Sequence, residues 1–266
     1  MTLEKKEFRS EEEIMKKRDL TGKEKESVVN SVVFDPVVGV DYKKHGRAYL
    51  GRRVMILGAS HYCEHFCWDK GCGPSCAHYG KYHLKLIGGE RLYFGKRCER
   101  FTEIVYERYC KRMKVPRKPS GRKRPDGWMG TFSRFYNSFF KVGNPTDEER
   151  TRLLDHLVCT EYVQGSEAKE WKEHNDKLMK AQRNFDELTG QVKRLKPDVI
   201  IVWGPRAWRE ICARAGIDCR KEKSKAVLGG HQVELLNTPH PAASVKRSEF
   251  QRRLRSAGIV LLSKCN

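Results

Sequence analysis

Four apolar runs, each followed by small or polar residues, constrain the fold of this chain more than any other feature of its sequence. Short apolar runs of this kind are typical of strands that are buried on both faces of a parallel sheet. Helical patterns lie between them, and alternating strands and helices build layered α/β folds. The runs are "RVMIL" (53–57), "HLVCT" (156–160), "DVIIVW" (198–203) and "VELLN" (233–237), and the helical patterns cover 102–113, 145–157, 175–195 and 205–216. The sequence therefore predicts a three-layer α/β/α sandwich with a central, mostly parallel four-stranded sheet.

Two of the helical patterns carry terminal signals. The 145–157 pattern begins with Thr146 and three acidic residues, which suit the positive end of a helix. The 205–216 pattern begins with Pro205 and ends with Gly216, as helices commonly do.

The chain is long enough for one α/β domain. Its 266 residues are 38% hydrophobic, which can fill a single core of ordinary size. Residues 1–30 are dense in charge and predict a solvated N-terminal arm, so the domain is expected to cover 31–266. No apolar stretch approaches the ~20 residues of a membrane span, and no signal peptide is visible. We expect a soluble, cytoplasmic monomer.

The charge points to a polyanionic partner. The chain has 54 Lys and Arg against 34 Asp and Glu, a net charge of +20, and such an excess favours nucleic acid by steering and counterion release. Eight of these cations lie in a basic loop at 110–127. Either the loop is simply a solvated charge run, or it contacts DNA phosphates. The candidate contacts are Arg117, Lys118, Arg122, Lys123 and Arg124.

A cysteine-rich insert at 63–78 predicts a metal site. Cys63, Cys67, Cys72 and Cys76 lie within fourteen residues, and four thiolates satisfy the ligand count of structural zinc. Their spacing differs from that of standard zinc knuckles. Ordinary reduced thiols and an iron–sulfur cluster stay open as alternatives.

The ends of the predicted strands are the expected place of a ligand site. Parallel sheets bind ligands at the carboxyl ends of their strands. Gly58, Glu161, Gly204 and the stretch after Asn237 all lie at such ends.

Three short motifs lie at these ends: "RVMILGASHYC" (53–63), "VIIVWGPRAW" (199–208) and "NTPHPAASVKRSEF" (237–250). In this order they resemble the uracil-DNA glycosylase superfamily. The third resembles its late motif, with the same order of His240, Pro241, Ser244, Val245, Arg247 and Phe250. The second resembles its apolar strand that ends in Trp-Gly before a helix, and the first falls where that family has its water-activating motif. The resemblance covers roughly residues 50–255, and the order of the motifs is more specific than any one of them.

The late motif implies the leaving-group chemistry. By the resemblance, His240 donates a hydrogen bond to a carbonyl oxygen of the departing base, although a histidine that merely caps the strand is the alternative. The loop after it enters the DNA minor groove, with Ser244, Lys246 and Arg247 as contacts. The bulky leucine of many relatives is absent, so Val245 or Lys246 would be the wedge.

The first motif departs from the family pattern. Ser60 and His61 stand where the family has its water-activating Asp or Asn and a Pro. Because imidazole titrates near neutral pH, water activation is assigned to His61 with Ser60 assisting, unless the cysteine insert recruits His61 as a metal ligand. The resemblance places Gly58, Ala59 and Tyr62 against the base, with Gly58 letting the chain pass close to a flipped nucleotide.

The second strand carries the candidate base reader. The uracil enzymes hold an Asn here, and the best register aligns Glu161, with Thr160 as the one-residue alternative. A carboxylate prefers donors, and the exocyclic amine of cytosine is one. A surface carboxylate at a helix N-terminus is the competing interpretation of Glu161. The aromatic residues Phe132, Phe135 and Tyr136 are assigned mainly to the core, with stacking on a flipped base as an alternative.

Together these observations predict a DNA glycosylase that acts on double-stranded DNA. The expected substrate is a modified cytosine, such as the glucosylated hydroxymethylcytosine of phage DNA, and the expected role is antiphage defence. The alternatives are a repair glycosylase for uracil or damaged bases, including the iron–sulfur type, and a non-catalytic zinc-containing DNA-binding protein.

Overall fold

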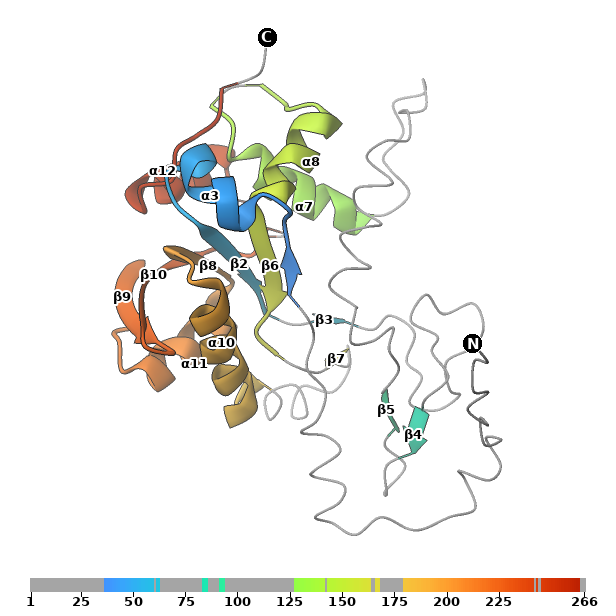
Figure 1. Ribbon diagram of the computed structural model, residues 1–266. Helices are drawn as coiled ribbons and strands as arrows, with labels where there is room; N and C mark the ends of the chain where they lie inside the picture. The colour runs from blue at the N-terminus through green and yellow to red at the C-terminus, as the bar shows by residue number, and fades with distance from the viewer. Residues whose placement is uncertain are drawn as a thin grey trace, which may run out of the picture.

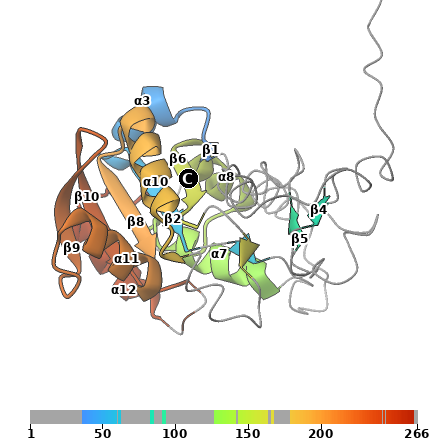
Figure 2. The same cartoon turned by 90° about the horizontal axis from the view of Figure 1, so that it is seen from below.

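A six-stranded sheet forms the centre of the structure. The computed structural model describes residues 36–59, 132–141, 143–163, 179–241, 243 and 245–263, together with the backbone of 61–62, 83–85, 91–93, 127–131 and 166–167. The strands follow the order β1 (Val37–Val38), β6 (Leu157–Glu161), β2 (Val54–Gly58), β8 (Val199–Trp203), β10 (His231–Thr238) and β9 (Lys223–Leu228). Figure 1 shows the arrangement, and Figure 2 shows this order from β9 at one edge to β1 at the other.

The four predicted strands are the parallel centre of this sheet. β6, β2, β8 and β10 pair with one another in parallel, which confirms the α/β class. The expected number of four strands was wrong, because β1 and β9 add antiparallel edges. β1 has only two residues, and most residues of β9 are exposed or half-buried, so neither has the apolar run of a central strand.

Helices alternate with the strands as the pattern predicts. The described helices are α3 (Tyr42–Leu50), α7 (Gly127–Asn137), α8 (Asp147–Asp155), α10 (Gln182–Leu195), α11 (Pro205–Ala215) and α12 (Arg247–Ser256). Thr146 caps α8 in a reciprocal capping box with Glu149, which confirms that start signal. Gly216 ends α11 with φ 66°, as predicted. α10 begins at Gln182, later than the 175–195 pattern indicates, and 102–113 lies outside the described residues.

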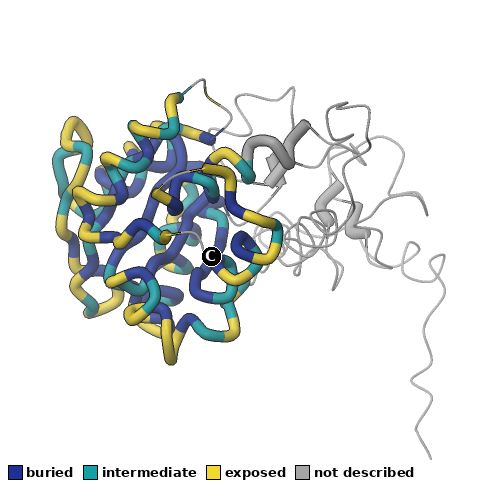
Figure 3. The backbone as a smooth tube through the Cα atoms, turned by 90° about the horizontal axis from the view of Figure 1, so that it is seen from above, coloured by how far each residue is buried: buried dark blue, intermediate teal, exposed yellow. Residues whose placement is uncertain are grey.

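Both faces of the sheet are covered. Along β2, Val54 and Ile56 pack into one buried cluster while Met55 and Leu57 pack into the other, because successive side chains of a strand point to opposite faces. The first cluster receives side chains from α7, α8 and α12, and the second from α10 and α11 (Figure 1). Figure 3 shows the buried residues concentrated along the strands and the inner sides of the helices. The layered arrangement follows from this packing.

Shorter paired segments lie outside the main sheet. β3 (His61–Tyr62) continues the chain beyond β2 and pairs in parallel with β7 (Ser166–Glu167), which follows β6. β4 (His83–Lys85) and β5 (Arg91–Tyr93) form an antiparallel pair. Within the described part of the chain, no helix is both long enough and apolar enough to cross a membrane.

Asp198 anchors the amino edge of the sheet, opposite the predicted site. Its carboxylate accepts hydrogen bonds from the backbone N–H of Arg53 at 2.8 Å and from the guanidinium of Arg47 at 3.0 Å. Burial alone would raise the pKa of Asp198, but these hydrogen bonds outweigh it and the pKa is lowered. Asp198 therefore ties the start of β8 to β2 and α3.

Replacing Asp198 with alanine should lower the free energy of unfolding by about 2 kcal/mol, because the buried backbone N–H of Arg53 loses a charged acceptor. Urea denaturation measures the change. Asp218→Ala is the matched control, since Asp218 pairs only locally with the exposed Arg220. An equal loss of stability in both variants would contradict the anchoring role.

Candidate functional site

The four parallel strands end in one row at the carboxyl edge of the sheet. Gly58 of β2 lies opposite Glu161 of β6, and Trp203 of β8 lies opposite Thr238 of β10. Leu57 of β2 pairs with Val202 of β8, and Gly58 and Trp203 are the next residues of these two strands. The row therefore reads Glu161, Gly58, Trp203 and Thr238 across neighbouring strands.

Glu161 and Trp203 project on the same face of the sheet. Trp203 belongs to the cluster that α7 and α12 cover, as do Leu157 and Cys159, whose parity along β6 is that of Glu161. Thr160 lies on the opposite parity and is 2% exposed. Of the two candidate base readers, Glu161 and Thr160, only Glu161 lies on the same face of the sheet as Trp203.

The carboxylate of Glu161 lies over the α-carbon of Gly58. A β-carbon built at Gly58 would stand 2.0 Å from Oε2 of Glu161 and 2.4 Å from its Cδ. Any other residue at position 58 must therefore move this carboxylate. The expectation for Gly58 was incomplete: the space left by its missing side chain is filled by Glu161.

Glu161 does not stand at the start of a helix. The backbone N–H groups of Tyr162 and Val163 donate to the carbonyls of Gly58 and Ala59 at 2.9 and 3.0 Å. The segments that follow β6 and β2 therefore stay paired beyond the sheet. β7 follows shortly after. The interpretation of Glu161 as a carboxylate at a helix N-terminus was therefore wrong.

His240 lies beside Trp203 at the other end of the row. It stands two residues beyond the end of β10, and its ring meets the indole of Trp203 edge to face, with centroids 6.3 Å apart at 80°. The residue is exposed in part, and the burial of the rest of its ring lowers the pKa of His240. The imidazole is therefore neutral at pH 7, when it can donate through one ring nitrogen.

The turn after His240 holds the histidine at this edge. The carbonyl of His240 accepts a hydrogen bond from the backbone N–H of Ala243 at 2.8 Å. Gly204, with φ 88°, follows Trp203, and its N–H donates to the carbonyl of Thr238 at 2.9 Å. The ends of β8 and β10 are thereby joined.

The aromatic residues of α7 cover Trp203. The rings of Phe132 and Phe135 stand at 71° and 76° to the indole, with centroids 5.7 and 4.8 Å away. Phe135 and Tyr136 are fully buried, whereas Phe132 is only half-buried. Of the three aromatic candidates for base stacking, Phe132 is therefore the one at the accessible edge.

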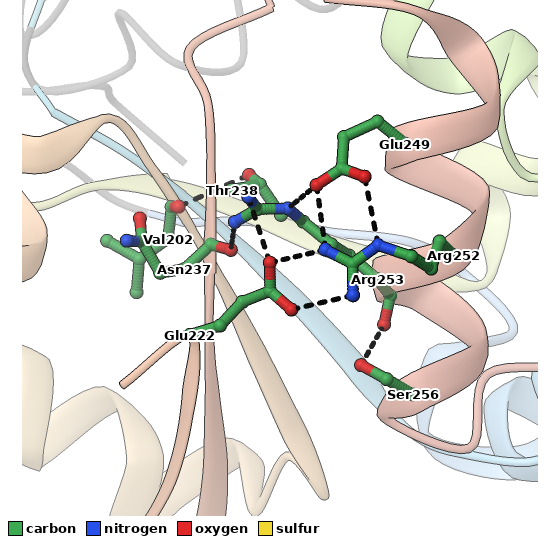
Figure 4. A network of polar contacts seen from close by, with 8 residues as sticks. All are labelled: Val202, Glu222, Asn237, Thr238, Glu249, Arg252, Arg253 and Ser256. Atoms are coloured by element: carbon green, nitrogen blue, oxygen red, sulfur yellow. Dashed lines mark hydrogen bonds and ion pairs between the residues drawn. The ribbon is translucent and has the colours of Figure 1, made fainter. Parts of the chain in front are cut away.

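An ion-pair network, made of Glu222, Glu249, Arg252 and Arg253, joins α12 to the end of β10 (Figure 4). Arg253 donates to the carbonyl of Asn237 at 2.7 Å, three residues before His240. It also contacts Glu249 at 2.7 Å and Glu222 at 2.9 Å. The network fixes the strand end from which the histidine segment leaves.

Acid should weaken this network. Hydrogen bonds from Arg252 and Arg253 lower the pKa of Glu249 from 4.5 to about 2. Because the folded-state pKa is depressed, the stabilising contribution of Glu249 is complete above pH 4.5 and is lost as the pH falls toward 2. The difference in unfolding free energy between the native chain and Glu249→Gln should therefore shrink across this window. Urea titrations at several pH values test this, and a difference that stays constant would contradict it.

The two wedge candidates after His240 differ in their burial. Val245 is half-buried against the core cluster, whereas Lys246 is exposed at the N-cap of α12. Lys246 is therefore the more accessible of the two, and the wedge itself stays a prediction. Arg247 donates to the backbone carbonyl of Phe140 at 2.6 Å and also to that of Gly143. This arginine therefore fastens α12 to the chain after α7. Its expected DNA contact stays a prediction.

Several predicted site residues are placed only in part. The backbone of His61 and Tyr62 forms β3, and Ala59 packs against the second core cluster. Outside the described residues lie Ser60, Ser244, the four cysteines of the insert, and the basic residues of the loop, Arg117, Lys118, Arg122, Lys123 and Arg124. In the described part of the chain, no group of three or more His, Cys, Asp or Glu could hold a metal ion. Three cysteines there, Cys159, Cys212 and Cys219, are free thiols.

Trp203 is the site residue that sequence reasoning missed. The tryptophan was assigned only to the strand, although an aromatic residue directly before a glycine at a strand end was a visible signal.

No protein-family model matches the chain, and a search of curated proteins also finds no match. The site therefore has to be interpreted from its own geometry.

Proposed function

We propose that this protein is a DNA glycosylase that flips a modified cytosine out of duplex DNA and hydrolyses its N-glycosidic bond. The observation that carries the proposal is the convergence of Glu161 and His240, from distant parts of the chain, at one edge of the sheet. His240 matches the late motif of the superfamily that the sequence resembles, and Glu161 aligns with the position at which that superfamily holds an Asn. A protein that only binds DNA would not need this pair.

The width of the edge suits a nucleobase. Three strand spacings, from β6 to β10, separate the backbones that carry the two residues, or about 14 Å at about 4.8 Å each. This span is longer than one planar heterocycle, so a base that contacts both side chains also lies against the indole of Trp203. Phe132, half-buried beside Trp203, offers an aromatic face at the same edge.

His240 would stabilise the leaving group. Cleavage of the N-glycosidic bond leaves negative charge on the departing base and an oxocarbenium-like sugar. A neutral imidazole beside the base can donate a hydrogen bond to its O2 oxygen, where this charge collects. The lowered pKa of His240 supports this role as a neutral donor.

Glu161 would select the base. An ionised carboxylate only accepts hydrogen bonds, and the cytosine ring offers its exocyclic amine as a donor. Uracil carries an acceptor at the same position, so a carboxylate there disfavours it. Glu161 therefore supports a cytosine derivative over uracil as the substrate.

The choice of a modified cytosine rests on biology as well as chemistry. A glycosylase that removed unmodified cytosine would destroy the genome of its own host. Hydroxymethylated and glucosylated cytosines of phage DNA avoid that difficulty, so the proposed role is antiphage defence. The net charge of +20 supports a polyanionic substrate. Water activation is proposed for His61 with Ser60.

The direct test uses phage DNA that contains glucosylated hydroxymethylcytosine. We expect purified protein to leave abasic sites in this DNA and to release the modified base, which mass spectrometry identifies. DNA with unmodified cytosine and a duplex that contains uracil are the comparisons. Release of uracil without release of the modified base would instead favour the repair glycosylase. Tight DNA binding without any released base would favour the non-catalytic binder.

A further inference from the structure

The row at the carboxyl edge has a gap in its centre. Between Glu161 on β6 and Trp203 on β8, the intervening strand presents Gly58, which has no side chain. The carboxylate of Glu161 lies in this gap, close to where a β-carbon of residue 58 would stand. Glu161 is thereby directed across β2 toward the strand that carries Trp203.

Trp203 brings a hydrogen-bond donor to the same row. The residue is 3% exposed, and among the residues that the structure describes, no atom accepts a hydrogen bond from its buried Nε1. A buried donor without an acceptor is costly, and a ligand or a bound water is one way in which such a group is satisfied. The indole of Trp208, in contrast, donates to the carbonyl of Cys219 at 2.8 Å.

The order of the polar groups follows the strand order. Glu161 on β6 offers an acceptor, Trp203 on β8 offers a donor, and His240 after β10 offers a second donor. The pairing edge of cytosine presents a donor at N4, an acceptor at N3 and an acceptor at O2, in this order. Each protein group therefore has its complement. In uracil, N3 carries a proton and would face the indole donor, while O4 would face the carboxylate.

We infer that Trp203 reads N3 of the flipped base through its indole N–H, and that Gly58 is a positioning residue that lets Glu161 read the neighbouring amine. The inference rests on the proposed function and names two specificity determinants beyond it. The rings of Phe132 and His240 flank the indole, and neither residue is fully buried.

Nuclear magnetic resonance tests the inference without catalysis. The indole N–H of each tryptophan gives a separate signal in a ¹⁵N-labelled sample, and Trp203→Phe assigns the one of interest. We expect free cytosine to move the Trp203 signal and free uracil to leave it in place. The Trp208 signal is the internal control. If cytosine moves other signals of the site but not that of Trp203, the indole is satisfied by a neighbouring aromatic face, and the inference is wrong.

Three variants separate the roles of the row. Trp203→Phe keeps an aromatic ring but removes the donor. It should weaken cytosine binding about tenfold, while Trp208→Phe should not weaken it.

Gly58→Ala should weaken cytosine binding as much as Glu161→Gln does. The double variant should be no weaker than Glu161→Gln alone, because both changes act through one carboxylate. Additive losses in the double variant would overturn the positioning role of Gly58.

The outcome also distinguishes this inference from the proposed function. If cytosine moves the Trp203 signal but no DNA releases a base, the site reads cytosine and the glycosylase proposal fails. If the modified base is released and Trp203→Phe keeps the same preference for cytosine over uracil, the glycosylase proposal stands and the inference fails.

Discussion

Replacing His240 with alanine should slow base release by about 10³-fold while leaving the affinity for duplex DNA unchanged. The variant removes the proposed donor to the departing base, whereas most of the expected DNA affinity comes from cations elsewhere on the chain. Because His240 belongs to neither core cluster and stands beyond the end of β10, its loss should not disturb the core. Single-turnover release of the modified base and a filter-binding titration measure the two quantities.

His231→Ala is the matched control for this experiment. His231 is the first residue of β10, whereas His240 follows the end of this strand. His231 therefore lies at the opposite edge of the sheet, where its Nε2 contacts the carbonyl of Pro197 at 2.9 Å. This control should release the base at the native rate. Equal losses of base release and DNA binding in His240→Ala would favour a non-catalytic binding protein instead.

Replacing Glu161 with glutamine should slow release of the modified cytosine by about 10²-fold. The change keeps the size of the side chain but removes the charged acceptor for the exocyclic amine and adds a donor. The same variant should release uracil no more slowly than the native protein, because a side-chain amide can donate to O4. Competition assays with duplexes that contain either base measure the ratio.

Glu187→Gln provides the matched control, since Glu187 lies on α10 and pairs with Arg194 at 3.4 Å. This variant should release modified cytosine and uracil in the same ratio as the native protein. An unchanged preference in Glu161→Gln would show that the carboxylate does not contact the base, and would remove the main argument for a cytosine substrate.

The sheet shows which parts of a fold local patterns can predict. The four central strands were predicted within two residues at each end, because burial on both faces requires continuous apolar runs. The edge strand β9 was missed, although a visible signal was present. Gly229 and Gly230, with φ 55° and 74°, form the two-residue turn to β10, and a Gly-Gly pair is typical of such hairpins.

The site shows a different limit. The sequence placed Glu161 and His240 at strand ends, and parallel pairing then brings such ends to one edge. The alignment of Glu161 with Gly58 depends on strand register, which is a long-range property that a single sequence does not reveal. The roles of Arg247 and Arg253 were likewise hidden, because their partners are backbone carbonyls distant in the chain. The resemblance to the late motif indicated only a DNA contact for Arg247.

The fastening of α12 at both ends has a consequence for how a reaction could proceed. At its start, Arg247 holds the carbonyl of Phe140, and further along Arg253 holds that of Asn237. The segment that carries His240 and the segment that follows α7 are thus parts of one preorganised unit. The energy needed to rearrange polar groups around a developing charge is then supplied during folding rather than at each turnover. On the proposed function, substitutions at Gly58 and Glu161 change which base is selected without rebuilding this unit, which separates the evolution of selectivity from that of reactivity.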